Sequence, residues 1–191
     1  AFALSIGKLP IVVRDTPGFL VNRLLMPYLN ESLLLLCEGV PMRELDATAR
    51  AFGMALGPIE MFDAIGMDTA MWAGRTLWEA FPNRTALTPV LPALVKRGRL
   101  GRKSGRGFYD YVTAGDHVDI ELEVMLQPYI RQVRQYGSDQ ILQRLLLPML
   151  VEATRVLEER VVADAREVDA GMLYGLAFPA ARGGLCYWAD R

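Results

Sequence analysis

One stretch of this chain occurs twice, and this repetition constrains the fold more than any other feature. Leu20 to Pro27 aligns with Ile141 to Pro148, so that an arginine, a Leu-Leu pair and a proline coincide at one offset. Two pairs of glutamates keep that offset, Glu31 with Glu152 and Glu38 with Glu159. Because a proline inside a helix costs about 3 kcal/mol, its recurrence indicates two copies of one helical unit. The alternative is that two leucine-rich helices match by composition alone.

The similarity continues beyond these two helices, with a slip of one residue. The further matched positions are Asp46 with Asp169, Phe52-Gly53 with Tyr174-Gly175, and Pro58 with Pro179, the last at the original offset. Packing the two copies about a pseudo-two-fold axis would bury the broad apolar face of each long helix. We therefore predict two domains, residues 1–112 and 118–191, joined by a linker at 113–117 in which Thr, Gly and Asp cluster.

Composition indicates an ordinary folded protein and excludes several classes. The chain has 191 residues, of which 52% are hydrophobic, and a net charge of −1, so no global field attracts nucleic acid or membranes. Cys37 and Cys186 are far apart and predict two reduced thiols, without a disulfide framework or a metal site. The richest apolar stretch, residues 20–37, contains Asn22, Arg23 and Glu31 and is therefore not predicted to span a membrane. The abrupt apolar start without Met suggests an excised fragment.

Helical periodicity dominates, so the predicted fold class is all-α. Residues 8–14 are predicted as a short strand or an extended segment, and Thr16 as the cap of the first long helix. Predicted helices cover residues 19–38, 42–52, a short stretch ending at 65, 68–80, a stretch ending near 97, 118–134, 138–160 and 164–174. A basic, glycine-rich loop occupies residues 98–107.

Three blocks of sequence carry a family resemblance. They are Asp15 to Leu25 (DTPGFLVNRLL), Gly57 to Asp68 (GPIEMFDAIGMD) and Gly101 to Tyr109 (GRKSGRGFY). In this order and spacing they resemble the C-terminal domain of 3-hydroxyacyl-CoA dehydrogenases. The first copy matches over nearly all of residues 7–112, and the second matches more loosely. A tandem pair of such domains resembles the multifunctional α-subunit of the fatty-acid β-oxidation complex.

The resemblance implies a fold, a reaction and partners. The fold would be two helical domains of the 6-phosphogluconate-dehydrogenase-C-terminal-like type packed as a pseudo-dimer. The family oxidises L-3-hydroxyacyl-CoA to 3-ketoacyl-CoA with NAD. A preceding Rossmann domain binds the NAD and also contains the His–Glu pair that acts as the base. This chain has no strand followed by G-x-G-x-x-G, so we expect the fragment to be inactive alone. A thiolase subunit is an implied partner, and a bacterial cytoplasmic location is expected.

The resemblance also implies roles for individual residues. Asn22 matches the family asparagine that orients the substrate oxygen, whereas the residue types alone would favour an asparagine on the helix surface. Gln143 stands at the matched position of the second copy, which is therefore expected to be structural. In the basic loop, Arg102 and Lys103 are candidates for binding the phosphates of CoA, and a solvated structural loop is the alternative. His117, in the linker, is not expected to act as a base.

Two other functions remain open at this stage. One is a stand-alone helical module for dimerisation or binding, without a catalytic role. The other is a related dehydrogenase that acts on a different small acid, which would lack the Gly105 to Tyr109 block. A nucleotide-binding motif encoded upstream would favour the hydroxyacyl-CoA dehydrogenase, whereas a nearby start codon would favour the stand-alone module.

Overall fold

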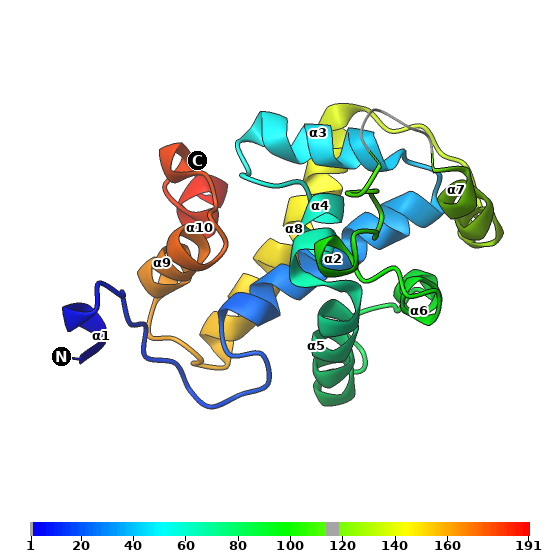
Figure 1. Ribbon diagram of the computed structural model, residues 1–191. Coiled ribbons are helices and arrows are strands. Elements are labelled where there is room, and N and C mark those ends of the chain that lie inside the picture. The colour runs from blue at the N-terminus through cyan, green and yellow to red at the C-terminus, as the bar shows by residue number, and fades with distance from the viewer. Residues whose placement is uncertain (1, 114–118) are drawn as a thin grey trace.

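The computed structural model describes residues 2–113 and 119–191, and over these ranges the protein is helical (Figure 1). The α-helices are α1 (Phe2–Ser5), α2 (Val21–Cys37), α3 (Met42–Phe52), α4 (Pro58–Ile65), α5 (Met67–Ala80), α6 (Val90–Lys96), α7 (Ile120–Leu126), α8 (Ser138–Glu158), α9 (Ala165–Gly175) and α10 (Leu185–Ala189). Short 3-10 helices are η1 (Arg102–Ser104), η2 (Gln127–Tyr129) and η3 (Ala180–Arg182). The described residues contain isolated β-bridges but no strand, which confirms the all-α prediction. None of their helices is both long and apolar enough to cross a membrane.

The predicted linker lies almost wholly outside the described residues. Residues 114–118, including His117, belong to this part, so the predictions for the linker and for this histidine are not assessed. The segment at residues 8–14 forms neither a helix nor a strand, and Arg14 donates its backbone N–H to the carbonyl oxygen of Val161 over 2.8 Å.

The centre of the molecule is the pair of long helices α2 and α8, which pack side by side (Figure 1). Their contact faces are mostly apolar, and Leu24, Leu29, Leu145 and Met149 are completely buried. Each helix contains its proline of the repeat, Pro27 or Pro148. The ion pairs between them join the start of each helix to the end of the other, which shows that the two helices run antiparallel.

The start of α2 differs from the prediction. The helix begins at Val21 after Leu20 and not near Thr16, and no side chain caps it. Gly18 (φ 77°) and Phe19 (φ 49°) have left-handed backbone conformations that end the preceding turn. A Cβ atom on Gly18 would lie 2.7 Å from the side chain of Leu77. The glycine therefore permits both the turn and its close approach to α5, which a capping signal alone does not predict.

The predicted helix over residues 118–134 is much shorter than expected. It ends at Leu126, Pro128 lies in the following 3-10 turn, and the chain then runs extended to α8. In this stretch the backbone N–H groups of Arg131 and Arg134 donate to the carbonyl oxygens of Cys37 and Glu38. These carbonyls lie at the end of α2 and have no partner within that helix. The N–H groups of Arg131 and Arg134 bond to them and not to carbonyls of their own segment, so residues 130–134 do not continue the helix.

The helices that follow α2 and α8 share one local arrangement of an aspartate and a helix start, which changes the alignment of the matched positions. Asp46 accepts a hydrogen bond from the backbone N–H of Ile59 over 2.8 Å, and Asp169 accepts one from Cys186 over 2.7 Å. Both donors are the second residue of a helix that follows a glycine, and a Cβ atom on that glycine would clash with the aspartate. The counterpart of Pro58 is therefore Leu185, and the predicted match of Pro58 with Pro179 is wrong.

Candidate functional site

Asn22 is the second residue of α2 and is exposed. Within the described residues its side chain makes no hydrogen bond or ion pair. It lies in the first helical turn, where backbone N–H groups without intrahelical partners give the helix its partial positive end. The amide is thus free to donate to a group that approaches this end of the helix.

An apolar groove runs along α2, starting one turn beyond Asn22. It has a volume of about 410 Å³ and is bounded by α2, α5, α6 and the loop between α5 and α6, with Phe62 of α4 and Glu152 of α8 also in its lining. Met26 and Pro27 form its α2 side, and most of the opposing side chains are apolar. These are Met71, Trp72, Leu77, Trp78, Phe81, Leu87, Leu91 and Pro92. Asn22, Arg102 and Lys103 are not among the lining residues.

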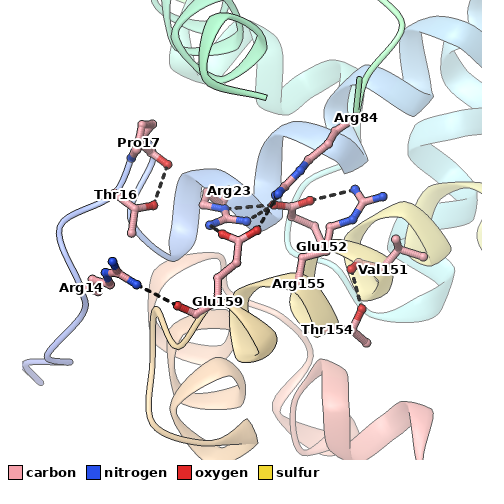
Figure 2. A network of polar contacts seen from close by, with 10 residues as sticks. All are labelled: Arg14, Thr16, Pro17, Arg23, Arg84, Val151, Glu152, Thr154, Arg155 and Glu159. Carbon is pink, nitrogen blue, oxygen red and sulfur yellow. Dashed lines mark hydrogen bonds and ion pairs between the residues drawn. The ribbon is translucent and has the colours of Figure 1, made fainter. Parts of the chain in front are cut away.

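Three lining residues of the groove, Arg23, Arg84 and Glu152, belong to a cluster of charged side chains. Figure 2 shows this cluster. Arg23 is completely buried and donates through Nε to Glu152 over 2.9 Å and through one terminal nitrogen to Glu159 over 2.7 Å. Arg84 donates to the same two carboxylates over 3.0 and 2.5 Å. Arg155 also contacts Glu152, so each of the three guanidinium groups is paired with a carboxylate and the cluster has one more positive group than negative groups.

The ring of Phe81 lies beside this charged cluster and lines the groove together with Arg23, Arg84 and Glu152. Arg23 and Arg84 both lie over this ring, with their guanidinium carbons 4.7 and 4.1 Å from its centroid. These distances are typical of cation–π contacts, which favour guanidinium groups held against an aromatic face. The contacts hold both arginines in the cluster with their charges already engaged.

A second charged cluster mirrors the first. Arg144, which matches Arg23 in the repeat, contacts Glu31 and Glu38, which match Glu152 and Glu159. Tyr136 also donates to Glu38, and the guanidinium of Arg144 lies 5.6 Å from the centroid of its ring. The arginine of each helix therefore pairs with the glutamates of the other helix. Gln143 is exposed, at the position in α8 that corresponds to Asn22.

The basic loop is organised by a buried carboxylate. Asp63 accepts hydrogen bonds from the backbone N–H groups of Phe108 and Tyr109 and from the hydroxyl of Tyr111, each at 2.9 Å. Burial raises the pKa of Asp63 despite these donors. A Cβ atom on Gly107 would lie 1.9 Å from the Asp63 carboxylate, so the loop can wrap around it only with glycine there.

The cations of this loop have different surroundings. Arg99 is buried, donates to the carbonyl oxygen of Gly107 over 2.8 Å and pairs with Asp119. Lys103 is exposed and pairs with Asp68, and the guanidinium of Arg102 lies 5.5 Å from the centroid of the Tyr111 ring. Arg99 thus has a structural role, whereas Arg102 and Lys103 remain at the surface. They are not brought together with Asn22 in one pocket.

Sequence analysis missed the groove and the pairing of the charges. The charged residues had a usable signal, because Arg23, Glu31 and Glu38 recur at matched positions within otherwise apolar helices. Trp72 and Trp78 carried no comparable signal. Their part in the groove depends on how α5 is placed against α2, which the sequence pattern of either helix does not specify.

Comparison with known proteins decides the family. Residues 18–111 match the family described as "3-hydroxyacyl-CoA dehydrogenase, C-terminal domain". Over these residues the chain belongs to that dehydrogenase family. The match includes the three sequence blocks from Gly18 onward, and with them Asn22, Asp63 and most of the groove.

Similar proteins extend the likeness over the rest of the chain. It is 36% identical, over 197 aligned residues, to proteins named "Fatty acid oxidation complex subunit alpha" from Pseudomonas aeruginosa (strain LESB58) and Pseudomonas entomophila (strain L48). The alignments cover 100% of this chain and 28% of each relative. The chain therefore spans little more than a quarter of the length of these proteins.

Solved structures of dehydrogenases share the fold. A 3-hydroxybutyryl-CoA dehydrogenase from Escherichia coli K12 aligns with a TM-score of 0.77 at 25% identity, covering 93% of this chain and 54% of that chain. The dehydrogenase part of multifunctional enzyme 1 from C. elegans gives a TM-score of 0.64 at 27% identity, covering 84% and 37%. Both alignments include most of this chain and not only its first 112 residues, because each covers more than four fifths of it.

Proposed function

We propose that this chain is the substrate-side portion of an NAD-dependent L-3-hydroxyacyl-CoA dehydrogenase of fatty-acid β-oxidation. The observation that carries the proposal is the exposed amide of Asn22 on the first turn of α2, within the segment that matches the dehydrogenase family. In this role the amide donates a hydrogen bond to the C3 oxygen of the substrate and holds it as alkoxide character develops.

NAD does not fit the residues described here. They form no strand–helix unit that would present backbone N–H groups to a pyrophosphate. We therefore assign NAD and the catalytic base to a nucleotide-binding Rossmann domain outside this chain, and expect the chain to be inactive alone. A thiolase subunit as partner and a cytoplasmic location are part of the same proposal, and the relatives named as a subunit of a fatty acid oxidation complex support it.

We further propose that residues 1–112 and 118–191 are two copies of one helical domain and that the second copy is an internal partner. The reciprocal contacts of Arg23 and Arg144 support this, because a two-fold arrangement makes each contact occur twice. The exposed Gln143 in place of asparagine supports a structural role for the second copy. Arg102 and Lys103 as ligands of the CoA phosphates stay a prediction, supported by their exposure.

The test measures turnover of acetoacetyl-CoA with NADH by the full-length parent protein. We expect Asn22→Ala to lower kcat by about 10²–10³, the loss typical of removing one hydrogen-bond donor to a developing oxyanion. The matched control is Gln143→Ala, at the equivalent position of the second copy, which should leave kcat unchanged. Full activity of Asn22→Ala would remove this residue from the mechanism and favour a helical module without a catalytic role.

A further inference from the structure

The backbone on both sides of Asn22 is held by α8 and α9. The side chain of Arg23, the next residue, is completely buried and donates to Glu159 at the end of α8 over 2.7 Å (Figure 2). The two preceding residues, Leu20 and Val21, lie against α9. The side chain of Asn22 itself is exposed. These two helices of the second copy therefore place the first turn of α2 without covering the amide that the turn presents.

Two glycines of α9 make this contact possible. A Cβ atom on Gly171 would lie 2.5 Å from the side chain of Leu20, and one on Gly175 would lie 2.8 Å from a γ-methyl of Val21. Leu20 is buried, and a valine in a helix is nearly confined to one rotamer, so neither side chain is free to turn away. An alanine at either place would therefore displace the start of α2.

The fold of α9 itself does not require these glycines. Both lie within the helix, and neither has the positive φ that disfavours other residues. Alanine favours a helix more than glycine does, so each glycine by itself lowers the stability of α9. The close approach of α9 to the start of α2 is the feature of the structure that calls for them.

The matched helix of the first copy has side chains at the same two places. α3 and α9 are both 11 residues long, and the aspartate that accepts from the following helix is the fifth residue of each. In this alignment Thr48 corresponds to Gly171 and Phe52 to Gly175, so the predicted match of Phe52 with Tyr174 shifts by one residue. Thr48 and Phe52 line a hollow of about 410 Å³ between α3 and the start of α8. Glycines thus stand against the helix start that presents the asparagine, whereas side chains and a hollow stand against the matched start of α8.

The position of Asn22 depends on these contacts, because no local interaction fixes it. The first turn of α2 has no side-chain cap, and the amide has no partner among the described residues. A donor to a developing oxyanion must lie about 2.7–3.1 Å from it, and a misplacement of about 1 Å can lower the rate about 10²-fold. The contacts that place the first turn of α2 therefore bear directly on turnover.

We propose that Gly171 and Gly175 are positioning residues for the dehydrogenase reaction. They let α9 seat directly on Leu20 and Val21, and this contact fixes the Asn22 amide where it meets the substrate oxygen. The inference rests on the proposed function, because it requires Asn22 to donate to that oxygen. The second copy then belongs to the active site through the backbone that it places, although none of its side chains touches the substrate.

The first test substitutes Gly175 in the full-length parent protein and measures kcat and KM for acetoacetyl-CoA with NADH. We expect Gly175→Ala to lower kcat about 10- to 100-fold, because the new methyl displaces Val21 and with it the Asn22 amide. KM should change less than about twofold, since the hydrogen bond from the amide strengthens mainly in the transition state. The matched control is Gly137→Ala, which should leave kcat unchanged. Gly137 has a φ of −74°, and nothing lies within 4 Å of a Cβ atom added there.

The second test removes the collision while keeping the substitution. In Val21→Ala the γ-methyls are absent, and the remaining Cβ atom lies 3.6 Å from a Cβ atom on Gly175, an ordinary contact. Adding Gly175→Ala to Val21→Ala should therefore change kcat less than about twofold. A substitution that merely damaged the fold would lower kcat equally in both backgrounds, which would overturn the proposal. Circular dichroism verifies folding, and Gly171→Ala, which meets Leu20 instead, tests the contact independently and should lower kcat at least about tenfold.

The third test determines whether the glycines act through Asn22, and it separates this inference from the proposed function. Adding Gly175→Ala to Asn22→Ala should lower kcat no further, because the amide that the glycine positions is already absent. An impaired Asn22→Ala parent combined with full kcat in folded Gly175→Ala and Gly171→Ala variants would retain the function and refute the positioning role. An equal loss from Gly175→Ala with and without the amide would refute it as well. Full activity of Asn22→Ala would refute the catalytic assignment itself, and the positioning role with it.

Discussion

At the residue scale, the two matched arginines of the repeat have unequal environments. The Arg23 side chain is completely buried against two glutamates, whereas 32% of the Arg144 side chain is exposed. Removing one partner of a buried ion pair costs about 3–5 kcal/mol, because the remaining charge stays buried. We expect Arg23→Met to lower the free energy of unfolding by about 3 kcal/mol, since Arg84 and Arg155 still contact Glu152. Arg144→Met should cost clearly less, and urea denaturation of both variants measures the difference. Equal losses would contradict the unequal burial.

The same residues show what sequence could predict at this scale. The sequence repeat aligned Arg23 with Arg144 and the two glutamates of α2 with the two of α8. In the structure each arginine has the same kind of partners, two glutamates of the opposite helix. The repeat did not predict that each arginine pairs with the glutamates of the other helix. That outcome depends on the antiparallel packing of α2 and α8, and an offset along the chain does not specify direction in space.

At the element scale, the loop from residue 99 to 111 depends on Asp63 of α4 for its shape. Asp63→Asn keeps the size of the side chain but replaces an acceptor oxygen by an NH₂ group, which would face N–H or O–H donors. We expect a loss of about 1–3 kcal/mol, the cost of leaving a buried polar group unsatisfied. Hydrogen exchange at the Phe108 and Tyr109 amides should accelerate in the variant. Glu121→Gln, an exposed change next to Arg99, is the control, and equal protection in both variants would refute the role of Asp63.

Sequence predicted elements well where local signals and packing agree. The helices at 42–52 and 138–158 have the predicted type and nearly the predicted bounds, and glycine ends the former at Gly53 as expected. The prediction failed where a tertiary contact decided the outcome. Gly18 approaches Leu77 and delays α2, and the carbonyls at the end of α2 hold residues 131–134 extended. Both contacts join segments that are distant in the chain, so neither appears in a local pattern.

At the scale of the whole molecule, the groove is a product of packing that no single segment encodes. Its walls come from α2, from α5 and α6 with the loop between them, and from single residues of α4 (Phe62) and α8 (Glu152). The three sequence blocks of the family identified the fold correctly, because they contain the glycines and aspartates that pin helices together. They did not indicate the groove, because its lining comes from five helices at once.

Stability as a function of pH tests whether Asp46 is as tightly enclosed as the packing implies. Burial raises the pKa of Asp46 to about 6, although Tyr109 and the backbone of Ile59 donate to it. The folded protein therefore keeps this proton between about pH 4 and 6, where the unfolded chain has lost it. Because the folded state binds more protons in this window, the contribution of Asp46 to stability falls as pH rises through it, by at most about 1.4 kcal/mol per pH unit, and is constant above it.

Asp46→Asn removes this titration and keeps the shape of the side chain. Relative to the unmodified protein, the variant should therefore gain stability as pH rises from about 4 to 6, measured by urea denaturation at each pH. Glu38 acts in the opposite direction: burial alone would raise its pKa, but hydrogen bonds from Arg144 and Tyr136 outweigh it and lower the pKa. Its contribution is lost as pH falls and is common to both proteins, so it cancels in the difference. Asp139→Asn, at an exposed carboxylate, corrects for removing one negative charge. A difference in the free energy of unfolding between Asp46→Asn and the unmodified protein that does not change with pH would show that the Asp46 carboxylate is solvated. The start of α4 would then be packed less tightly than its contacts at Gly57 and Ile59 require.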